Sequence, residues 1–215
     1  MSCWALVPIK SRAECKTRLA HWLAPAERLD IVREMAGRVL AAAQGTRSID
    51  HVAVVTPERD CVPMDVLVLD EPGGGLNPAL DFARRQLVAR GASELVVLPA
   101  DLPLVTAEDI DLLVARGRKT GFALATDTAC MGTNALFLKP ADAFRFRFGP
   151  DSRRHHLAEC ARLGWTAESV CTRGLEFDLD RVEDLIHLRT QGDACVASMR
   201  LFSTGAAWLP QTRYG

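Results

Sequence analysis

The sequence predicts an α/β fold in which a mostly parallel sheet is covered by helices on both faces. Apolar segments of strand length alternate with amphipathic segments of helix length through the first 120 residues, which is the pattern of βαβ units. The chain has 215 residues, of which 48% are hydrophobic and 25% are charged. That length and composition are sufficient for one substantial hydrophobic core.

Strands are expected where short apolar runs end at Pro, Gly or polar residues. These runs cover residues 3–10, 51–57, 65–72, 94–101, 122–127, 134–140 and 166–171, and the first of them passes into a loop at Pro8. Helices are expected where apolar residues recur every three or four positions. They cover residues 25–45, 77–91, 106–119, 153–164 and 181–192. The longest has Pro25 in its first turn and Gly45 at its end, and Thr106 is the expected N-cap of the third.

Charge and hydropathy exclude several classes of protein. The formal net charge of −1 gives no support for nucleic-acid binding through a basic face. No segment approaches the roughly 18 apolar residues of a membrane span, and the first residues lack the pattern of a signal peptide. The seven cysteines show no zinc-ligand spacing. We therefore expect a cytoplasmic protein with one domain over residues 1–192 and a C-terminal tail over 193–215.

Two acidic groups follow apolar segments. Asp101 ends the run "VVLPADLPLV" at residues 96–105, and a carboxylate at the end of a buried strand is costly unless a cation lies beside it. Asp178 and Asp180 precede the last expected helix, where they could equally serve as helix caps. If both groups meet at one edge of the sheet, their carboxylates together with phosphate oxygens would suit Mg²⁺. The sequence thus predicts a metal ion as the cation beside Asp101.

The loop after the first strand is rich in cations. The segment "PIKSRAECKTRL" contains four cationic residues, namely Lys10, Arg12, Lys16 and Arg18. Such a cluster suits a phosphate chain, although a solvated charge run is the commoner outcome for a short basic stretch. Neither GxxxxGK[ST] nor GxGxxG follows the strand, which disfavours a P-loop kinase and a dinucleotide-dependent oxidoreductase.

Two further loops carry hydrogen-bonding residues. The glycine-rich segment 70–80 would let its backbone approach a base or ribose, and Asn77 adds an amide that both donates and accepts. In the segment 130–138, Gly132 allows close approach and is followed by two hydrogen-bonding residues, Thr133 and Asn134. The segment 146–156 offers a hydroxyl, a guanidinium and an imidazole for a small anionic acceptor, namely Ser152, Arg153 and His156. A single histidine on a helix face is more often structural than functional.

Six segments together resemble a known family. "WALVPIK…KTRL", "LNPAL", "LPADLPL", "GTNALFL", "FGPDS…H" and "FDLDRVEDL" occur in the order found in 2-phospho-L-lactate guanylyltransferases, the CofC family of the MobA-like nucleotidyltransferase superfamily. The resemblance covers residues 3–192. It implies a single Rossmann-like nucleotidyltransferase domain with a mixed, mostly parallel sheet, and a homodimer. It also implies transfer of GMP from GTP to a small phosphorylated carboxylic acid, with release of pyrophosphate, in the biosynthesis of coenzyme F(420).

The resemblance also implies roles for individual residues. Lys10 and Lys16 would hold the triphosphate or the acceptor phosphate and, with Asp101, act in catalysis. Mg²⁺ would be bound by Asp101 and Asp180, with Asp178 beside them. Guanine and ribose would be approached by Glu71, Gly73 and Asn77, and the acceptor would be bound by Thr133, Asn134 and Ser152.

The sequence departs from the family pattern near the acceptor. Cys130 and Met131 precede the "GTN" segment, and Arg153 stands where an aromatic residue is frequent. Arg181 and Val182 replace a Thr-Pro pair in the acidic segment. An altered pocket with an additional arginine favours phosphoenolpyruvate or 3-phospho-D-glycerate over 2-phospho-L-lactate as the acceptor.

Two alternatives stay open on the sequence. One is a non-catalytic GTP-binding regulatory protein with the same fold. The other is a MobA-like nucleotidyltransferase acting on another phosphorylated acceptor, although such relatives begin with a glycine-rich "LAGG"-type loop that is absent here.

Overall fold

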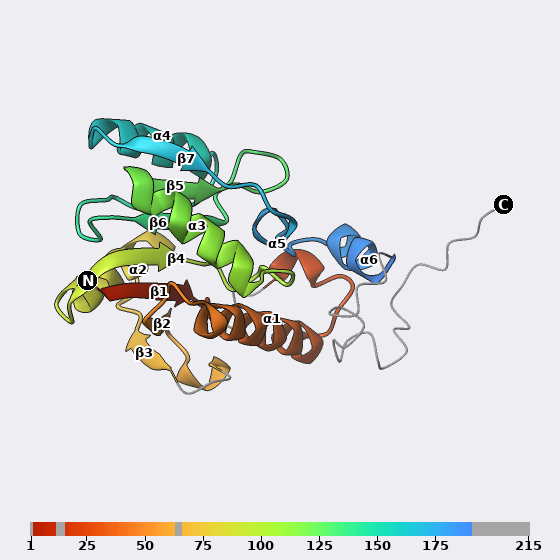
Figure 1. Cartoon of the computed structure of the whole chain (residues 1–215). Coiled ribbons are helices and arrows are strands. Elements are labelled where there is room, and N and C mark those ends of the chain that lie inside the picture. The colour runs from red at the N-terminus through yellow and green to blue at the C-terminus, as the bar shows by residue number, and fades with distance from the viewer. Residues whose placement is uncertain (1, 12–15, 63–65, 191–215) are drawn as a thin grey trace.

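A seven-stranded sheet forms the centre of the molecule. The computed structural model describes residues 2–11, 16–62 and 66–190 (Figure 1). The strands lie in the order β3-β2-β1-β4-β6-β5-β7. Their bounds are β1 Ser2–Pro8, β2 His51–Thr56, β3 Leu67–Asp70, β4 Ala92–Val97, β5 Gly121–Ala125, β6 Ala135–Leu138 and β7 Thr166–Ser169. The predicted tail over 193–215 and the loop residue Arg12 lie outside the described residues, so the domain boundary at 192 stays a prediction.

The sheet is mixed but mostly parallel, as the sequence predicts. Parallel pairing joins most neighbouring strands, namely β1–β2, β1–β4, β2–β3 and β5–β7. Only the two pairs made by β6, with β4 and with β5, are antiparallel among the described strands. The segment between β5 and β6 contains no helix, so the chain turns back on itself instead of crossing over the sheet. The direction of β6 follows from that short connection.

Helices cover both faces of the sheet (Figure 1). The cores on the two faces are distinct: α1 and α3 contribute side chains to one apolar cluster, and α2 and α4 contribute to the other. Successive residues of β1 alternate between the two clusters, with Ala5 and Val7 in the first and Trp4 and Leu6 in the second, as expected for a strand buried on both faces. The bounds are α1 Pro25–Gly45, α2 Leu76–Val88, α3 Ala107–Thr120, α4 Ser152–Arg162, α5 Arg173–Glu176 and α6 Val182–Thr190, with short 3₁₀ turns at Thr17–Leu19 and Arg59–Cys61.

Local signals place the long helices correctly. The first helix has the predicted bounds of residues 25–45. The N-cap of α3 is Thr106, whose Oγ1 accepts a hydrogen bond of 3.2 Å from the backbone N–H of Asp109. The Asp109 carboxylate accepts in return from the backbone N–H of Thr106 at 3.0 Å, which completes a capping box. The sequence did not predict α5 or the two 3₁₀ turns, because elements of three or four residues are too short to show a period.

A third apolar cluster positions the segment that contains Asp178 and Asp180 next to the end of β4. Leu19 from the first 3₁₀ turn and Met35 from α1 are buried together with Leu185 from α6. This contact fixes the segment that precedes α6. As a result, the backbone N–H of Leu179 donates a hydrogen bond of 3.0 Å to the carbonyl of Asp101.

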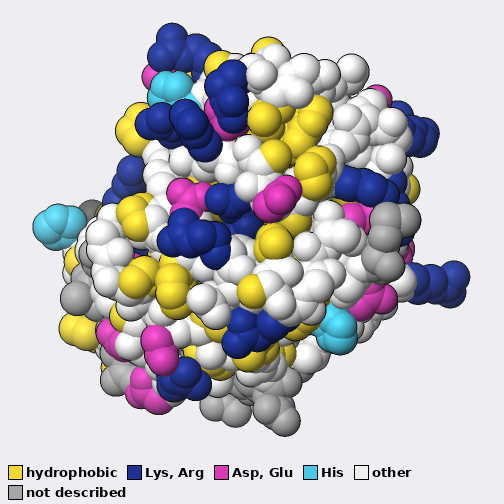
Figure 2. Space-filling view, turned by 90° about the vertical axis from the view of Figure 1, so that its left-hand side faces the viewer, with side chains coloured by type: hydrophobic (Ala, Val, Ile, Leu, Met, Phe, Trp, Pro, Cys, Tyr) yellow, Lys and Arg dark blue, Asp and Glu magenta, His cyan; other side chains and the backbone are white. Residues whose placement is uncertain are grey.

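The surface seen from the beginning of β1 carries charges of both signs. Figure 2 shows Lys and Arg side chains beside Asp and Glu side chains across the middle of this face, with hydrophobic side chains scattered among them. At the start of β4, the buried carboxylate of Glu94 accepts from Arg118 Nη2 at 2.7 Å and from Lys139 Nζ at 2.9 Å. None of the described helices is long and apolar enough to cross a membrane.

We expect the substitution Gly117→Ala to destabilise the protein, against the usual preference of helices for alanine. A Cβ at this position of α3 would overlap Cδ1 of Phe137, a fully buried ring on β6. Alanine normally stabilises a helix interior by about 1 kcal/mol, but overpacking here should lower the free energy of unfolding by about 1–3 kcal/mol. Urea denaturation measures the difference. Gly45→Ala is the control, because its Cβ would meet Ala107 at an ordinary 3.8 Å and should not destabilise.

Candidate active site

A cleft of about 630 Å³ opens at the carboxyl ends of β1 and β4. This is the edge of an open α/β sheet where ligands bind, and the volume is within the range of small-molecule sites. The predicted site residues that line it are Lys10, Lys16, Asn77, Asp101, Thr133, Asn134, Ser152, Asp178 and Asp180. Glu71, Gly73, Arg153 and His156 are not part of this lining.

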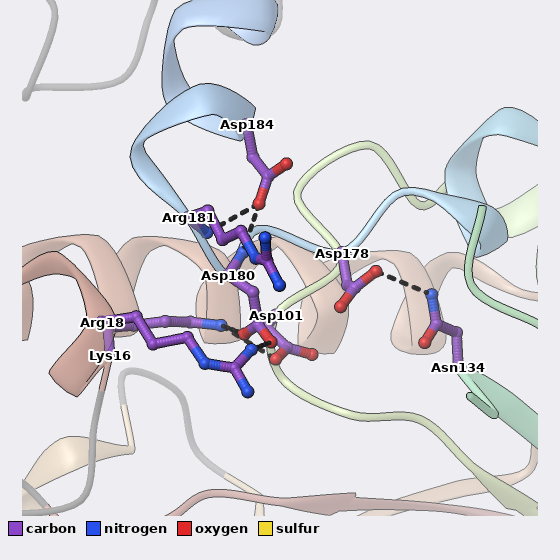
Figure 3. Close-up of polar contacts among 8 residues, drawn as sticks. All are labelled: Lys16, Arg18, Asp101, Asn134, Asp178, Asp180, Arg181 and Asp184. Atoms are coloured by element: carbon purple, nitrogen blue, oxygen red, sulfur yellow. Dashed lines mark hydrogen bonds and ion pairs between the residues drawn. The ribbon is translucent and has the colours of Figure 1, made fainter. Parts of the chain in front are cut away.

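Lys16 links the two acidic groups at this edge (Figure 3). Its Nζ donates to Oδ2 of Asp101 and to Oδ1 of Asp180, at 2.9 Å in each case. Arg18 Nη1 contacts the other oxygen of Asp180 at 3.0 Å. The cation beside Asp101 among the described residues is therefore the ammonium group of Lys16, and the metal ion expected near this carboxylate stays a prediction.

The positive charge of Lys16 is stabilised by the two carboxylates that it contacts. Its side chain is only 8% exposed, and burial alone would lower the pKa of the ammonium group. The carboxylates of Asp101 and Asp180 outweigh that effect and raise this pKa above its usual value. Burial raises the pKa of Asp180. Lys16 and then Arg18 lower this pKa by a larger amount, so the net pKa lies below the ordinary value. Lys16 and Asp180 thus stay charged at neutral pH.

Asp178 is left with excess negative charge around it. Its Oδ1 accepts a long hydrogen bond of 3.4 Å from Asn134 Nδ2, which also donates to the carbonyl of Glu176 at 3.1 Å. Burial, followed by the charges of Asp101 and Asp180, raises the pKa of Asp178 from 3.8 to about 6. A cation or a proton near Asp178 would therefore be favourable.

We expect Asp178→Asn to stabilise the ligand-free protein at neutral pH. A folded-state pKa above the unfolded value means that stability is fully present below about pH 4 and falls as pH rises through about 6. Asparagine removes that loss, and the melting temperature at pH 7 should rise by about 2–4 °C, after allowance for solvent screening. Melting curves of both proteins from pH 4 to pH 8 test this. The two curves should converge near pH 4, and a constant offset at every pH would contradict the explanation.

The carboxylates at this edge fit a divalent cation that arrives with phosphate. No group of three or more His, Cys, Asp or Glu residues is arranged as a metal site within the described residues. Mg²⁺ is, however, usually held by one or two carboxylates together with substrate phosphates. Asp101 and Asp180, with Asp178 beside them, carry more negative charge than Lys16 alone offsets. The donor set is thus suited to Mg²⁺ in the presence of a polyphosphate.

The loop between β5 and β6 shapes the other side of the cleft. Asp127 lines the cleft, and its Oδ1 accepts from the backbone N–H groups of Met131 at 2.8 Å and Gly132 at 3.0 Å. The sequence interpretation did not include Asp127. The signal was an Asp before a short glycine-containing loop, which favours a side-chain-to-backbone turn. The turn presents Thr133 and Asn134 to the cleft.

Asn77 joins the two sides of the cleft. Its Nδ2 donates to the carbonyl of Phe148 at 2.9 Å, and its Oδ1 accepts from the backbone N–H of Phe148 at 2.7 Å. Both amide atoms predicted to face guanine or ribose are thus engaged with the protein backbone. Asn77 connects the first turn of α2 to the segment before α4, where Gly149 and Ser152 also line the cleft.

Glu71 and Gly73 lie before α2, outside the cleft lining. The backbone N–H of Glu71 donates to the carbonyl of Thr56 at 3.1 Å. Gly73 begins a run of three glycines with φ of 86°, 90° and 88°, which other residues adopt only with strain. The glycines therefore serve to turn the chain into α2.

His156 and Arg153 also lie differently from the prediction. The His156 side chain is fully buried and contacts Thr133 Oγ1 through Nδ1 at 2.9 Å. Its Nε2 accepts from the backbone N–H of Arg147 at 3.0 Å. The ring is buried next to Thr133, which lines the cleft, so His156 does not lie where the predicted direct contact with an acceptor could form. The backbone N–H of Arg153 donates to the carbonyl of Met131 at 3.1 Å, and its side chain is outside the lining.

Comparison with solved structures supports the fold. A putative nucleotide-diphospho-sugar transferase from Desulfovibrio desulfuricans superposes with a TM-score of 0.76 at 14% identity over 94% of each chain. A 4-diphosphocytidyl-2C-methyl-D-erythritol synthase superposes with a TM-score of 0.58 at 14% identity, over 88% of this chain and 97% of that one. At these identities the likeness shows a shared fold and nothing more.

Sequence comparison identifies the family. A model described as "Guanylyl transferase CofC like" matches residues 3–205. A phosphoenolpyruvate guanylyltransferase from Sphaerobacter thermophilus is 38% identical over 87% of this chain and 93% of its own length. One from Rubrobacter xylanophilus is 38% identical over 89% and 96%. The chain therefore belongs to the CofC-like guanylyltransferase family and is a nucleotidyltransferase.

Proposed function

We propose that the protein transfers GMP from GTP to phosphoenolpyruvate, with release of pyrophosphate. The observation that carries this proposal is the Lys16–Asp101–Asp180 cluster at the carboxyl edge of the sheet, inside a cleft that also contains Lys10. The choice of acceptor is supported by the curated relatives named phosphoenolpyruvate guanylyltransferase. 3-Phospho-D-glycerate and 2-phospho-L-lactate are the competing acceptors, and the product would serve coenzyme F(420) biosynthesis.

The reaction needs positioning and charge neutralisation more than proton transfer. An oxygen of the acceptor phosphate attacks the α-phosphorus of GTP, and the bond from that phosphorus to the oxygen bridging to the β-phosphate breaks. The attacking oxygen is already anionic, so no general base is required. Lys10 and Lys16 neutralise negative charge on the phosphates as pyrophosphate departs.

We further propose that Mg²⁺ takes part in this site. Asp101 and Asp180 would hold the ion, with Asp178 beside them. Bound there with the nucleotide, the ion would supply electrostatic stabilisation of the phosphate oxygens. Lys16 contacts Asp101 and Asp180 in the structure, so it would keep both carboxylates in place before the nucleotide arrives.

The direct test is pyrophosphate release with purified protein, Mg²⁺ and each of the three acids. GTP should support release with phosphoenolpyruvate, whereas ATP and CTP serve as nucleotide controls. Release with another acid would change the acceptor and keep the transferase. Binding of GTP without release with any of the three would reject the proposed reaction.

A further inference from the structure

A buried histidine near the cleft lies between the segment that contains Arg147 and the loop that contains Thr133. His156 on α4 is fully buried. Its two ring nitrogens contact different segments: Nε2 meets the backbone N–H of Arg147 at 3.0 Å, and Nδ1 meets Oγ1 of Thr133 at 2.9 Å. Thr133 lines the cleft, whereas His156 does not.

The contact with Arg147 determines which ring nitrogen carries the proton. A backbone N–H can only donate, so Nε2 must be the unprotonated, accepting nitrogen. In a neutral imidazole the proton then resides on Nδ1, which donates to the hydroxyl oxygen of Thr133. Burial, followed by the neighbouring charge of His155, lowers the pKa of His156 to about 4. The ring is therefore neutral at physiological pH.

The proton position has a consequence for Thr133. A hydroxyl has one donor and two acceptor positions. Because Oγ1 accepts from His156, its own proton is available to donate elsewhere. Within the described part of the chain, the structure records no further partner for that hydroxyl, and Thr133 is one of the residues that line the cleft.

Two aromatic rings hold the imidazole in this orientation. Phe148 meets it edge to face with the ring centroids 4.7 Å apart, and Phe144 lies at 5.6 Å. These rings belong to the same segment as Arg147, and Asn77 fixes the backbone of Phe148 from the far side of the cleft. The histidine is thus preorganised by packing as well as by hydrogen bonds.

We infer that His156 is a positioning residue that makes the Thr133 hydroxyl a hydrogen-bond donor toward the anionic acceptor in the cleft. This inference rests on the proposed function, because it takes the acceptor to be a phosphorylated carboxylic acid. A carboxylate or phosphate oxygen only accepts, so a threonine whose proton pointed at the histidine would present lone pairs and repel it. The arrangement favours the acceptor specifically and leaves GTP binding unchanged.

Two matched variants separate this role from simple support of the loop. In His156→Asn, the amide nitrogen lies near the place of Nδ1 and can still donate to Thr133, while the contact with Arg147 is lost. In His156→Gln, the longer amide reaches the place of Nε2 and can accept from Arg147, while donation to Thr133 is lost. We expect His156→Gln to raise the KM for the acid about tenfold. His156→Asn should raise it less than about threefold, with the KM for GTP unchanged in both.

If His156 only supports the loop through its contact with Arg147, His156→Gln should raise the KM for the acid less than His156→Asn does. That result would overturn the inference. Thr133→Val should also raise the KM for the acid about tenfold, and Thr133→Ser should not. In the Thr133→Val background, His156→Gln should add almost nothing, because both changes remove one shared interaction. Independent, multiplying effects would also overturn it. Melting curves of each variant show whether it is folded.

A spectroscopic measurement separates this inference from the proposed reaction. In ¹⁵N-labelled wild-type protein, long-range proton–nitrogen correlation spectra should show the proton of His156 on Nδ1. A proton on Nε2 would overturn the inference even if the enzyme is active. If no acid supports pyrophosphate release, the proposed function fails, and calorimetric binding of phosphoenolpyruvate to wild type and Thr133→Val then decides. Equal affinities would reject the inference, and weaker binding by the variant would support it.

Discussion

Replacing Asp101 with asparagine is expected to reduce pyrophosphate release at least about a hundredfold while the protein stays folded. The carboxylate contacts Lys16 Nζ at 2.9 Å and is 31% exposed to the cleft. Asparagine keeps the shape of the side chain but removes the charge that orients Lys16 and that the proposed Mg²⁺ would need. Lys16 keeps Asp180 as a partner at 2.9 Å, and repulsion between residue 101 and Asp178 is removed. The backbone carbonyl that holds Leu179 is also unaffected, so the melting temperature should change little. Initial rates with saturating GTP and phosphoenolpyruvate measure the effect.

Asp70 provides a matched control for this variant. It also ends a strand of the parallel part of the sheet and is paired with a cation, Arg59, at 2.8 Å. Its side chain is 74% exposed and lies outside the cleft lining. Asp70→Asn should therefore leave the rate within about twofold of wild type, because an exposed ion pair contributes little. Near-normal activity of Asp101→Asn would reject the role assigned to the carboxylate cluster.

Replacing Lys16 with methionine is expected to affect both activity and stability. Methionine fills a similar volume but leaves Asp101 and Asp180 without the ammonium between them. Removing one partner from a buried ion pair costs about 3–5 kcal/mol. Since Asp101 and Asp180 still reach solvent, we expect a loss of about 1–2 kcal/mol here. Pyrophosphate release should fall at least about a hundredfold.

A double variant distinguishes the two effects of Lys16. Adding Asp180→Asn to Lys16→Met removes one of the uncompensated carboxylates and should restore part of the lost stability. It should not restore activity, because the groups that face the phosphates are still missing. Urea denaturation and pyrophosphate release are measured on the same preparations. Recovery of activity together with stability would mean that Lys16 has only a structural role.

The long helices and the alternation of elements could be predicted because their signals are local. Apolar residues at helical spacing, together with Pro25 and Gly45, mark α1, and the reciprocal pair Thr106 and Asp109 marks the start of α3. The reversal of β6 left no comparable signal. Strand direction depends on whether the connecting segment crosses the sheet, and the apolar run at 134–140 looks the same in either direction.

The acidic half of the candidate site could be predicted for a similar reason. Asp101 follows a strand, and in an open α/β sheet the ends of parallel strands share one edge. The roles of Asn77 and His156 could not be read in this way. Asn77 bonds to the backbone of Phe148, and His156 accepts from the backbone N–H of Arg147. Only the folded chain shows that these partners exist.

By itself, the sequence determined the strands and long helices of the fold and the edge of the sheet at which charged residues gather. It did so because periodicity, capping residues and strand ends are recorded within a few neighbouring positions. The tertiary structure alone decided which charges meet. Lys16 contacts Asp101 and Asp180 across 85 and 164 positions of the chain, and Thr133 contacts His156 across 23. Such pairs depend on how α6 and α4 pack against the sheet, and no local pattern of residues records that packing.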